Sequence, residues 1–154
     1  MGNILRFALQ MELDGKNFYH RLALHVKASD HKKVLFSLAA DEEKHYQKLK
    51  TVQRTDKHRF LKSEQLAGLQ NVFREQIFVV NYGQLNIMEI YQLALRFEEL
   101  SVLFYRGLAE SSLDKAVTSI FKQLAEEEEE HRQQIWQLIQ LLSRSEEWYP
   151  YLDL

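Results

Sequence analysis

The sequence carries one set of glutamate and histidine residues twice, at a constant spacing. In each half a single glutamate is followed 30 positions later by a Glu-x-x-His sequence, and the second set lies 86 positions after the first. The six residues are Glu12, Glu42 and His45 in the first half and Glu98, Glu128 and His131 in the second. A lone Glu on one helix and a Glu-x-x-His on the next, supplied twice, is the ligand set with which four-helix bundles hold two metal ions.

The apolar residues predict a chain made of long helices. The single proline lies near the C-terminus and there are five glycines, so little interrupts a helix. Apolar residues recur at steps of three and four. We predict helices over residues 3–27, 29–54, 87–110 and 112–143. Ser29 is expected to cap the second helix, Asn86 with Glu89 to form a capping box at the third, and Ser111 or Ser112 to precede the fourth.

The connections between these helices predict a topology. Two connections are short and make antiparallel hairpins, whereas the middle connection, residues 55–86, is long enough to travel the length of the bundle. The two hairpins can then pack about a pseudo-twofold axis, which brings the repeated residues together. Within the crossover, Leu66, Leu69, Phe73 and Ile77 keep a helical spacing, so we expect an extra helix there. We predict one all-α domain over residues 1–154.

The position of the charged residues within apolar stripes points to metal binding. A carboxylate buried without a partner costs several kcal/mol or takes up a proton, and four converging carboxylates repel one another. Two divalent cations would cancel the four charges. The chain has no cysteine, so the ligands must be nitrogen and oxygen. Iron is the leading candidate, manganese is the second, and manganese or zinc are expected as substitutes for iron.

Each feature alone has a simpler explanation. The run from Glu126 to Glu130 is, by itself, typical of a solvated helix face, and a single Glu-x-x-His is common by chance in Glu-rich helices. The other histidines have no acidic residue at a spacing that would let both bind one metal ion, and we expect them at the surface. They are His20, His25, His31 and His58. Only the doubled pattern, with both copies embedded in apolar stripes, favours a metal centre.

Two tyrosines accompany the repeat. Tyr19 and Tyr105 lie two helical turns after Glu12 and Glu98. They can be ordinary core aromatics, or their hydroxyls can donate to a ligand carboxylate. The sequence leaves both readings open.

Composition excludes several partners. The net charge is −2 and lysine and arginine are spread along the chain, so no basic patch is expected to attract nucleic acid or anionic lipid. The N-terminal segment lacks the apolar core of a signal peptide, and no segment is apolar enough for a membrane span. We therefore expect a cytoplasmic protein with no membrane and no nucleic-acid partner.

At these motifs the chain resembles a rubrerythrin-type member of the ferritin-like di-iron carboxylate superfamily. The pattern AxxxExxxxxFYxxLA occurs at residues 8–23 and again at 94–109, with LAADEEKH at 38–45 and LAEEEEEH at 124–131. The resemblance covers nearly the whole chain outside the crossover. It implies a ferritin-like four-helix bundle made of two antiparallel hairpins.

The resemblance also implies roles for individual residues. Glu12 and Glu98 would be terminal ligands, Glu42 and Glu128 would bridge, and His45 and His131 would each bind one of two irons. Asp41 and Glu127, just before the bridging residues, match positions where the superfamily often has an acid that bonds the opposite histidine and fixes its tautomer.

At some positions the sequence differs from related families, and these differences exclude some of their properties from what we expect of this chain. Classical rubrerythrins carry a further Glu one turn after the lone Glu of the third helix, where this chain has Ser101, and a cysteine-rich rubredoxin domain, which this sequence lacks. Bacterioferritins place a haem-ligating Met directly after the second-helix Glu, where this chain has Glu43, so no haem is expected.

The resemblance implies a di-iron oxidoreductase that reduces hydrogen peroxide or dioxygen with electrons from an external donor protein. An iron-binding or storage protein is the alternative, and a scaffold that keeps metal for structure is a third. Apolar residues outside the four helical stripes lead us to expect a homodimer. They are Phe73, Ile77, Phe78, Trp136, Trp148 and Tyr149.

Overall fold

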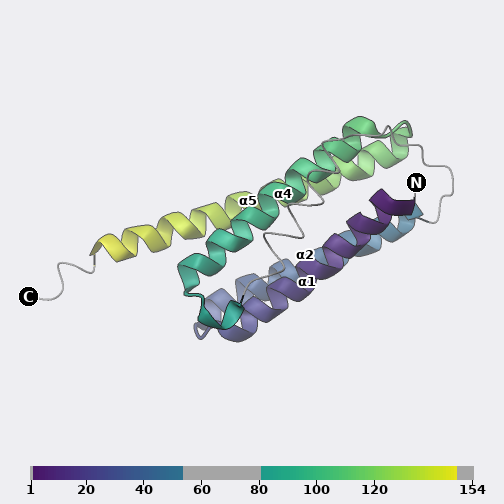
Figure 1. Cartoon of the computed structure of the whole chain (residues 1–154). Coiled ribbons are helices and arrows are strands. Elements are labelled where there is room, and N and C mark those ends of the chain that lie inside the picture. The colour runs from purple at the N-terminus through teal and green to yellow at the C-terminus, as the bar shows by residue number, and fades with distance from the viewer. Residues whose placement is uncertain (1, 54–80, 149–154) are drawn as a thin grey trace, which may run out of the picture.

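The computed structural model of the chain describes residues 2–53 and 81–148 (Figure 1). The described elements are α1 (Gly2–His25), α2 (Ser29–Gln53), the short 3-10 helix η1 (Tyr82–Gln84), α4 (Ile87–Ser111) and α5 (Lys115–Trp148). These ranges contain four long helices and no strand, so the predicted all-α class is confirmed. The extra helix expected around Leu66 and Phe73 lies outside the described residues, as do Ile77, Phe78 and Tyr149.

The helices form two antiparallel hairpins that lie alongside each other. Helix α1 packs along α2, and α4 packs along α5, while contacts between the two hairpins are fewer (Figure 1). The last turns of α5 extend past the start of α4 toward the C-terminus. This is the arrangement expected for a four-helix bundle of the ferritin-like kind.

Local hydrogen bonds explain where the helices begin. The predicted capping box at α4 is confirmed: Asn86 Oδ1 accepts from the Glu89 backbone N–H at 2.9 Å, and the Asn86 N–H donates to Glu89 Oε2 at 2.8 Å. Helix α2 begins at Ser29 as expected, but the prediction that Ser29 caps it was wrong. The carbonyl that accepts the first bond, from the Lys32 N–H, belongs to Ala28, which is therefore the N-cap residue.

The expected start of the last helix was wrong. Helix α5 begins at Lys115, because Asp114 Oδ1 accepts from the backbone N–H groups of Ala116 at 2.8 Å and Val117 at 3.2 Å. Ser112 instead ends α4 as its C-cap. The helix also continues to Trp148, five residues beyond the expected end at 143.

All four helices contribute to one core. Its largest fully buried side chains are aromatic and come mainly from α1 and α4: Phe18, Tyr19, Tyr91, Phe97, Phe104 and Tyr105, with Phe121 from α5. Several of the rings meet edge to face, and Tyr19 lies at 90° to Phe97 with centroids 5.9 Å apart. Four glutamates share this core, and their carboxylates need compensation.

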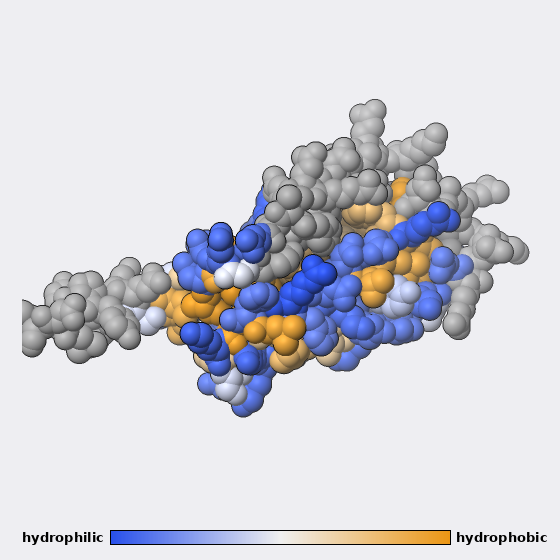
Figure 2. Space-filling view, turned by 60° about the horizontal axis from the view of Figure 1, so that its bottom comes forward, coloured by the Kyte–Doolittle hydropathy of each residue, from blue (hydrophilic) through white to orange (hydrophobic). Residues whose placement is uncertain are grey.

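The described surface is mostly polar, with apolar patches. Figure 2 shows hydrophilic side chains over most of one face and orange areas between them. Large exposed apolar residues include Trp136 and Leu141 on α5, which are 49% and 61% exposed. None of the described helices is long and apolar enough to span a membrane.

Candidate metal centre

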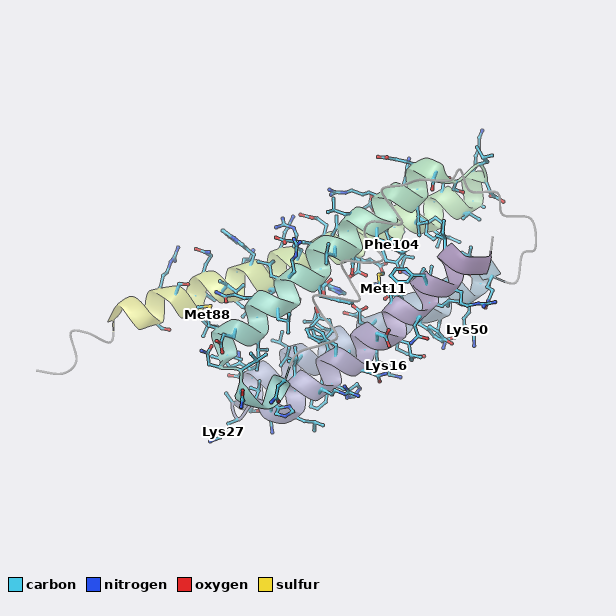
Figure 3. All side chains as sticks on the ribbon, in the orientation of Figure 1. Met11, Lys16, Lys27, Lys50, Met88 and Phe104 are labelled. Atoms are coloured by element: carbon cyan, nitrogen blue, oxygen red, sulfur yellow. The ribbon has the colours of Figure 1, made fainter. Side chains whose placement is uncertain are left out.

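The structure brings the six repeated residues together between the two hairpins. Helix α1 contributes Glu12 and α4 contributes Glu98, while α2 and α5 each contribute a Glu and a His from one face, because a spacing of three keeps both side chains on the same side of a helix. The four glutamates are fully buried, His45 is 1% exposed and His131 is 8% exposed. Figure 3 shows Met11 and Phe104 in the same inner region of the bundle.

The six residues form two overlapping groups, each close enough together to hold a metal ion. Glu12, Glu42, His45 and Glu128 form the first group, and Glu42, Glu98, Glu128 and His131 form the second. In each group one ligand atom per residue lies within 4.8 Å of the others. Glu42 and Glu128 belong to both groups. Carboxylates shared in this way can bridge two ions, as two-metal sites require.

The unpaired atoms of this cluster fit a pair of metal ions. Among the described residues, the buried side-chain oxygens and nitrogens that lack a hydrogen-bond partner all belong to it: Glu12 Oε2, both Glu42 oxygens, His45 Nδ1, Glu98 Oε2 and Glu128 Oε1. A buried polar atom without a partner costs about 1–3 kcal/mol, more when it is charged. Carboxylate and imidazole donors suit iron, manganese and zinc. Cations at the centre would satisfy these atoms together.

Each tyrosine holds a glutamate of the other hairpin. The Tyr19 hydroxyl on α1 donates to Glu98 Oε1 on α4, and the Tyr105 hydroxyl on α4 donates to Glu12 Oε1 on α1. Burial, followed by the charges of Glu98 on Tyr19 and of Glu12 on Tyr105, raises the pKa of both phenols. The hydroxyls therefore keep their protons and act as donors.

Each histidine is bonded by an acid of the opposite hairpin. His45 Nε2 lies 2.9 Å from Glu127 Oε2, and His131 Nε2 lies 3.3 Å from Asp41 Oδ2. This places the acids where the resemblance implied them. With Nε2 donating to the acid, Nδ1 faces the cluster, where its lone pair can bind a metal ion. His45 Nδ1 lies 3.2 Å from Glu128 Oε1.

The electrostatics of the cluster are those of crowded carboxylates. Burial and then the charge of Glu128 raise the pKa of both Glu42 and Glu98. Burial alone would lower the pKa of His131, but hydrogen bonds to Glu128 and Glu98 and their charges raise it to about 10. Burial likewise opposes the protonation of His45, yet the Glu128 charge raises its pKa. Without a metal, protons must supply the missing positive charge.

Small residues lie next to the cluster at equivalent positions of the two halves, Gly15 and Ser101. A Cβ on Gly15 would lie 2.6 Å from Phe97 Cζ and 2.8 Å from Glu42 Oε2, closer than real Cβ contacts. Glycine at this position therefore lets Glu42 and Phe97 approach α1. The equivalent residue of the second half, Ser101, is fully buried and its hydroxyl donates to the Phe97 carbonyl at 3.0 Å.

A cavity of about 300 Å³ opens onto the histidine side of the cluster between α2 and α5. Its lining residues are Asp41, Lys44, His45, Lys48, Glu127, Glu130 and His131. The two lysines were missed by the sequence analysis, although Lys48 lies one helical turn after His45 and could have been found as a partner for Glu127. A larger cavity of about 680 Å³ lies between α4 and α5, and the six cluster residues are not among those that line it.

Among the remaining acidic and histidine candidates, those on exposed positions agree with the expected surface roles, and His31 does not. Within the run of five glutamates, Glu128 is the buried member, and Glu126 and Glu130 are exposed. His20 and His25 are exposed as expected. His31 is half-buried and its Nδ1 lies 2.7 Å from the Tyr91 hydroxyl, which the sequence did not indicate. His58 lies outside the described residues.

Comparison with known structures identifies the fold. A putative ferritin-like di-iron carboxylate protein from Thermotoga maritima is 19% identical, with a TM-score of 0.69, and the match covers 90% of this chain and 93% of that one. The dodecameric thioferritin of Bacteroides fragilis, a bacterioferritin-related protein, is also 19% identical, with a TM-score of 0.71 and coverage of 97% and 89%. No curated protein matches the sequence.

The family follows from the sequence match. Residues 3–135 match the family Rubrerythrin, which is most of the chain and includes all six cluster residues. The chain therefore belongs to the Rubrerythrin family.

Proposed function

We propose that this protein is a di-iron oxidoreductase that reduces hydrogen peroxide or dioxygen with electrons from an external donor protein. One observation carries the proposal: Glu42 and Glu128 belong to both ligand groups. Glu12 with His45 would complete one iron position, and Glu98 with His131 the other. The family match and the unpaired buried atoms of the same residues support this assignment.

Two iron ions held there would supply electrons to the oxidant and stabilise negative charge that develops on its oxygens. The protein supplies the rest. Glu42 and Glu128 would set the separation of the ions, and Tyr19 and Tyr105 hold the terminal carboxylates in place. Buried aromatic residues such as Phe97 and Phe104 keep bulk water from the cluster.

The cavity between α2 and α5 is the proposed route for the oxidant. It reaches His45 and His131 from solvent, and its volume of about 300 Å³ is ample for a molecule of two oxygen atoms. Reduction of one hydrogen peroxide to two waters consumes two electrons and two protons. One electron would come from each of the two irons, which become ferric, and an external donor protein would then return them to the ferrous state, because the chain has no cysteine to hold a second redox centre such as an iron–sulfur cluster.

Iron binding or storage is the second candidate function. It is favoured by the structural likeness to a protein named a thioferritin, which assembles as a dodecamer. A storage protein would oxidise iron at the same residues but deposit the product as mineral. For this chain we propose a homodimer, and a dodecamer would instead strengthen the storage function.

Stopped-flow oxidation distinguishes the two functions. The protein is loaded anaerobically with two equivalents of ferrous iron and mixed with hydrogen peroxide or with dioxygen, and the absorbance of the oxidised centre is followed. The oxidoreductase predicts faster oxidation by peroxide and a product that an external reductant returns to the starting state. Comparable rates with both oxidants, together with growth of ferric mineral under excess iron, would overturn it in favour of storage.

A further inference from the structure

The two halves of the centre differ where the sequence repeat breaks. The acids that bond the histidines, Asp41 and Glu127, occupy equivalent positions 86 residues apart, but glutamate is longer by one methylene. Glu127 accordingly approaches its histidine, His45, to 2.9 Å, whereas Asp41 stays 3.3 Å from His131. The first bond has the shorter, stronger geometry for a charge-assisted hydrogen bond.

A lysine supports the first of these acids from another helix. Lys48 Nζ on α2 donates to Glu127 Oε1 on α5, while Glu127 Oε2 bonds His45. Both oxygens of Glu127 are thus occupied, and the chain Lys48–Glu127–His45 links α2 to α5. At the position equivalent to Lys48, the second half has Gln134, whose side chain carries no charge.

Among the residues that the structure describes, the lysine that pairs with the other acid comes from that acid's own helix. Lys44 Nζ donates to Asp41 Oδ1 at 2.6 Å, one turn along α2, and the Lys44 side chain is 71% exposed. An exposed pair three residues apart contributes little rigidity, because water competes with it and the lysine pays conformational entropy. By comparison, the side chains of Lys48 and Glu127 are 33% and 32% exposed.

The two histidines also differ in their exposure to solvent. His45 is 1% exposed, but His131 is 8% exposed, and both border the cavity between α2 and α5. His131 has the longer bond, and its acid partner Asp41 pairs with the more exposed lysine. It is therefore also the histidine that solvent reaches more easily.

From these contacts we infer that the two metal positions are unequal and that Lys48 is the positioning residue that makes them so. The position with Glu12 and His45 fills first and holds its ion, whereas the position with Glu98 and His131 fills second and exchanges. This inference deepens the proposed function, since it rests on the same two-metal centre.

We expect Lys48 to strengthen metal binding at the His45 position through the orientation of His45, although its positive charge acts against binding. A lysine near a cation repels it, which would weaken the first position. That repulsion is reduced because the Glu127 carboxylate lies between Lys48 and His45 and because the pair is one-third exposed to screening solvent. Orientation of a ligand histidine by its acid partner changes metal affinity by about 10–100-fold. Lys48 contacts Glu127 and not the histidine itself, so we expect its effect on metal affinity at the His45 position to be about tenfold, the lower end of that range.

Cobalt(II) serves as the probe because it is redox-stable and gives anomalous scattering. Crystals of the whole chain are grown with one equivalent of cobalt per chain and, separately, with excess cobalt. The occupancy of each metal position is then measured from anomalous differences. At one equivalent, the wild type should fill the His45 position about tenfold more than the His131 position. Lys48→Met should bring the two occupancies close to equal, and Lys48→Arg, which keeps a charged donor, should restore the order.

Lys33→Met is the matched control. It removes the same charge from an exposed residue of α2 and should leave the filling order unchanged. Release of cobalt to a chelator, followed by visible absorbance, should show one fast and one slow ion in the wild type and two fast ions in Lys48→Met. A merely structural role for Lys48 would not change which position fills first.

The outcomes separate this inference from the proposed function. The inference is overturned if the wild type at one equivalent of cobalt fills both positions equally, or if Lys48→Met binds cobalt more tightly at the His45 position. The proposed function still stands in either case, provided that two ions bind at excess cobalt. Fewer than two ions per chain at excess metal overturns both. The wild-type filling order decides the inequality of the positions even if a variant fails to fold.

Discussion

The Tyr105 hydroxyl on α4 donates a hydrogen bond to Glu12 on α1, 93 positions earlier in the chain. The bond ties one hairpin to a ligand residue of the other inside a fully buried environment. Tyr19 and Glu98 make the reciprocal bond. The cluster is therefore held by the contact between the hairpins, and each hairpin alone would lack a partner for its own glutamate.

Replacing Tyr105 by Phe tests this cross-link. The change should destabilise the metal-free protein by about 1–3 kcal/mol, because a buried carboxylate oxygen loses its donor while the ring still packs. Urea unfolding of the metal-free protein measures the change, and metal analysis should still find two ions per chain after loading. Tyr46→Phe, in a tyrosine of α2 that is only half-buried, is the control and should change stability by less than about 0.5 kcal/mol. Equal stability of Tyr105→Phe and wild type would argue against the cross-link.

Gly15→Ala should damage the centre although alanine favours helices. The helix gains up to about 1 kcal/mol from the change, but the new Cβ would lie 2.8 Å from Glu42 Oε2 and 2.6 Å from Phe97 Cζ. Overpacking of this kind costs about 1–3 kcal/mol and pushes Glu42 away from its bridging place. We expect lower metal affinity by calorimetry and a lower midpoint of thermal unfolding. Asn17→Ala, at an exposed position of the same helix, should do neither.

The metal-free protein should lose stability as the pH rises from about 6.5 to about 10. The pKa of His131 is raised to about 10 when the protein is folded, so this residue binds a proton more tightly in the folded state and stabilises it below its unfolded value of 6.5. That contribution is lost as the pH rises through the folded value. Burial and then the Glu128 charge raise the pKa of Glu98 in the folded protein. Glu98 therefore also makes the folded state less stable as the pH rises, but at lower pH than His131, because Glu98 loses its proton first in the unfolded chain.

Thermal unfolding at pH 6.5 and at pH 9 measures this effect. The midpoint of the metal-free protein should be lower at pH 9. With two equivalents of zinc it should not fall, because the ligands are then deprotonated and metal binding favours the folded state more strongly at high pH. A metal-free midpoint that rises with pH would show that protons do not compensate the buried carboxylates.

Exposed apolar side chains on α5 predict self-association. Trp136 and Leu141 are 49% and 61% exposed, and contiguous apolar surface commonly marks an interface. We expect a homodimer by light scattering at micromolar concentration, and Trp136→Glu should shift it toward the monomer. Lys122→Glu, in an exposed residue of the same helix, should not. A wild-type mass of one chain would contradict the prediction.

Much of the architecture could be predicted because the decisive signals are local. The Glu-x-x-His spacing places Glu42 and His45 on one helix face whatever lies around them, and the constant offset to Glu128 and His131 indicates two equivalent hairpins. The capping box of Asn86 and Glu89 is a signal of four residues and was located correctly. The structure places all six predicted ligand residues in one buried cluster.

The features that the sequence could not supply depend on distances between helices. A spacing argument relates Tyr19 only to its own helix, whereas its hydroxyl bonds Glu98 of the other hairpin. The unequal bonds of Asp41 and Glu127 arise from a difference of one methylene across the gap between α2 and α5. Asp114 starts α5 because its side chain reaches two backbone N–H groups, and the nearby serines gave an equally plausible local signal.

The metal content of the chain shows whether the six clustered residues bind two ions. The chain is loaded anaerobically with ferrous iron, freed of excess metal and analysed by mass spectrometry for iron per chain, beside Glu42→Ala and the neighbouring control Glu43→Ala. Because Glu42 belongs to both ligand groups, we predict about two ions in wild type and in Glu43→Ala, and loss of both together in Glu42→Ala. Trace metal in the wild type after loading with iron, manganese or zinc would show that the six residues do not form a two-metal centre, as would two ions retained in Glu42→Ala.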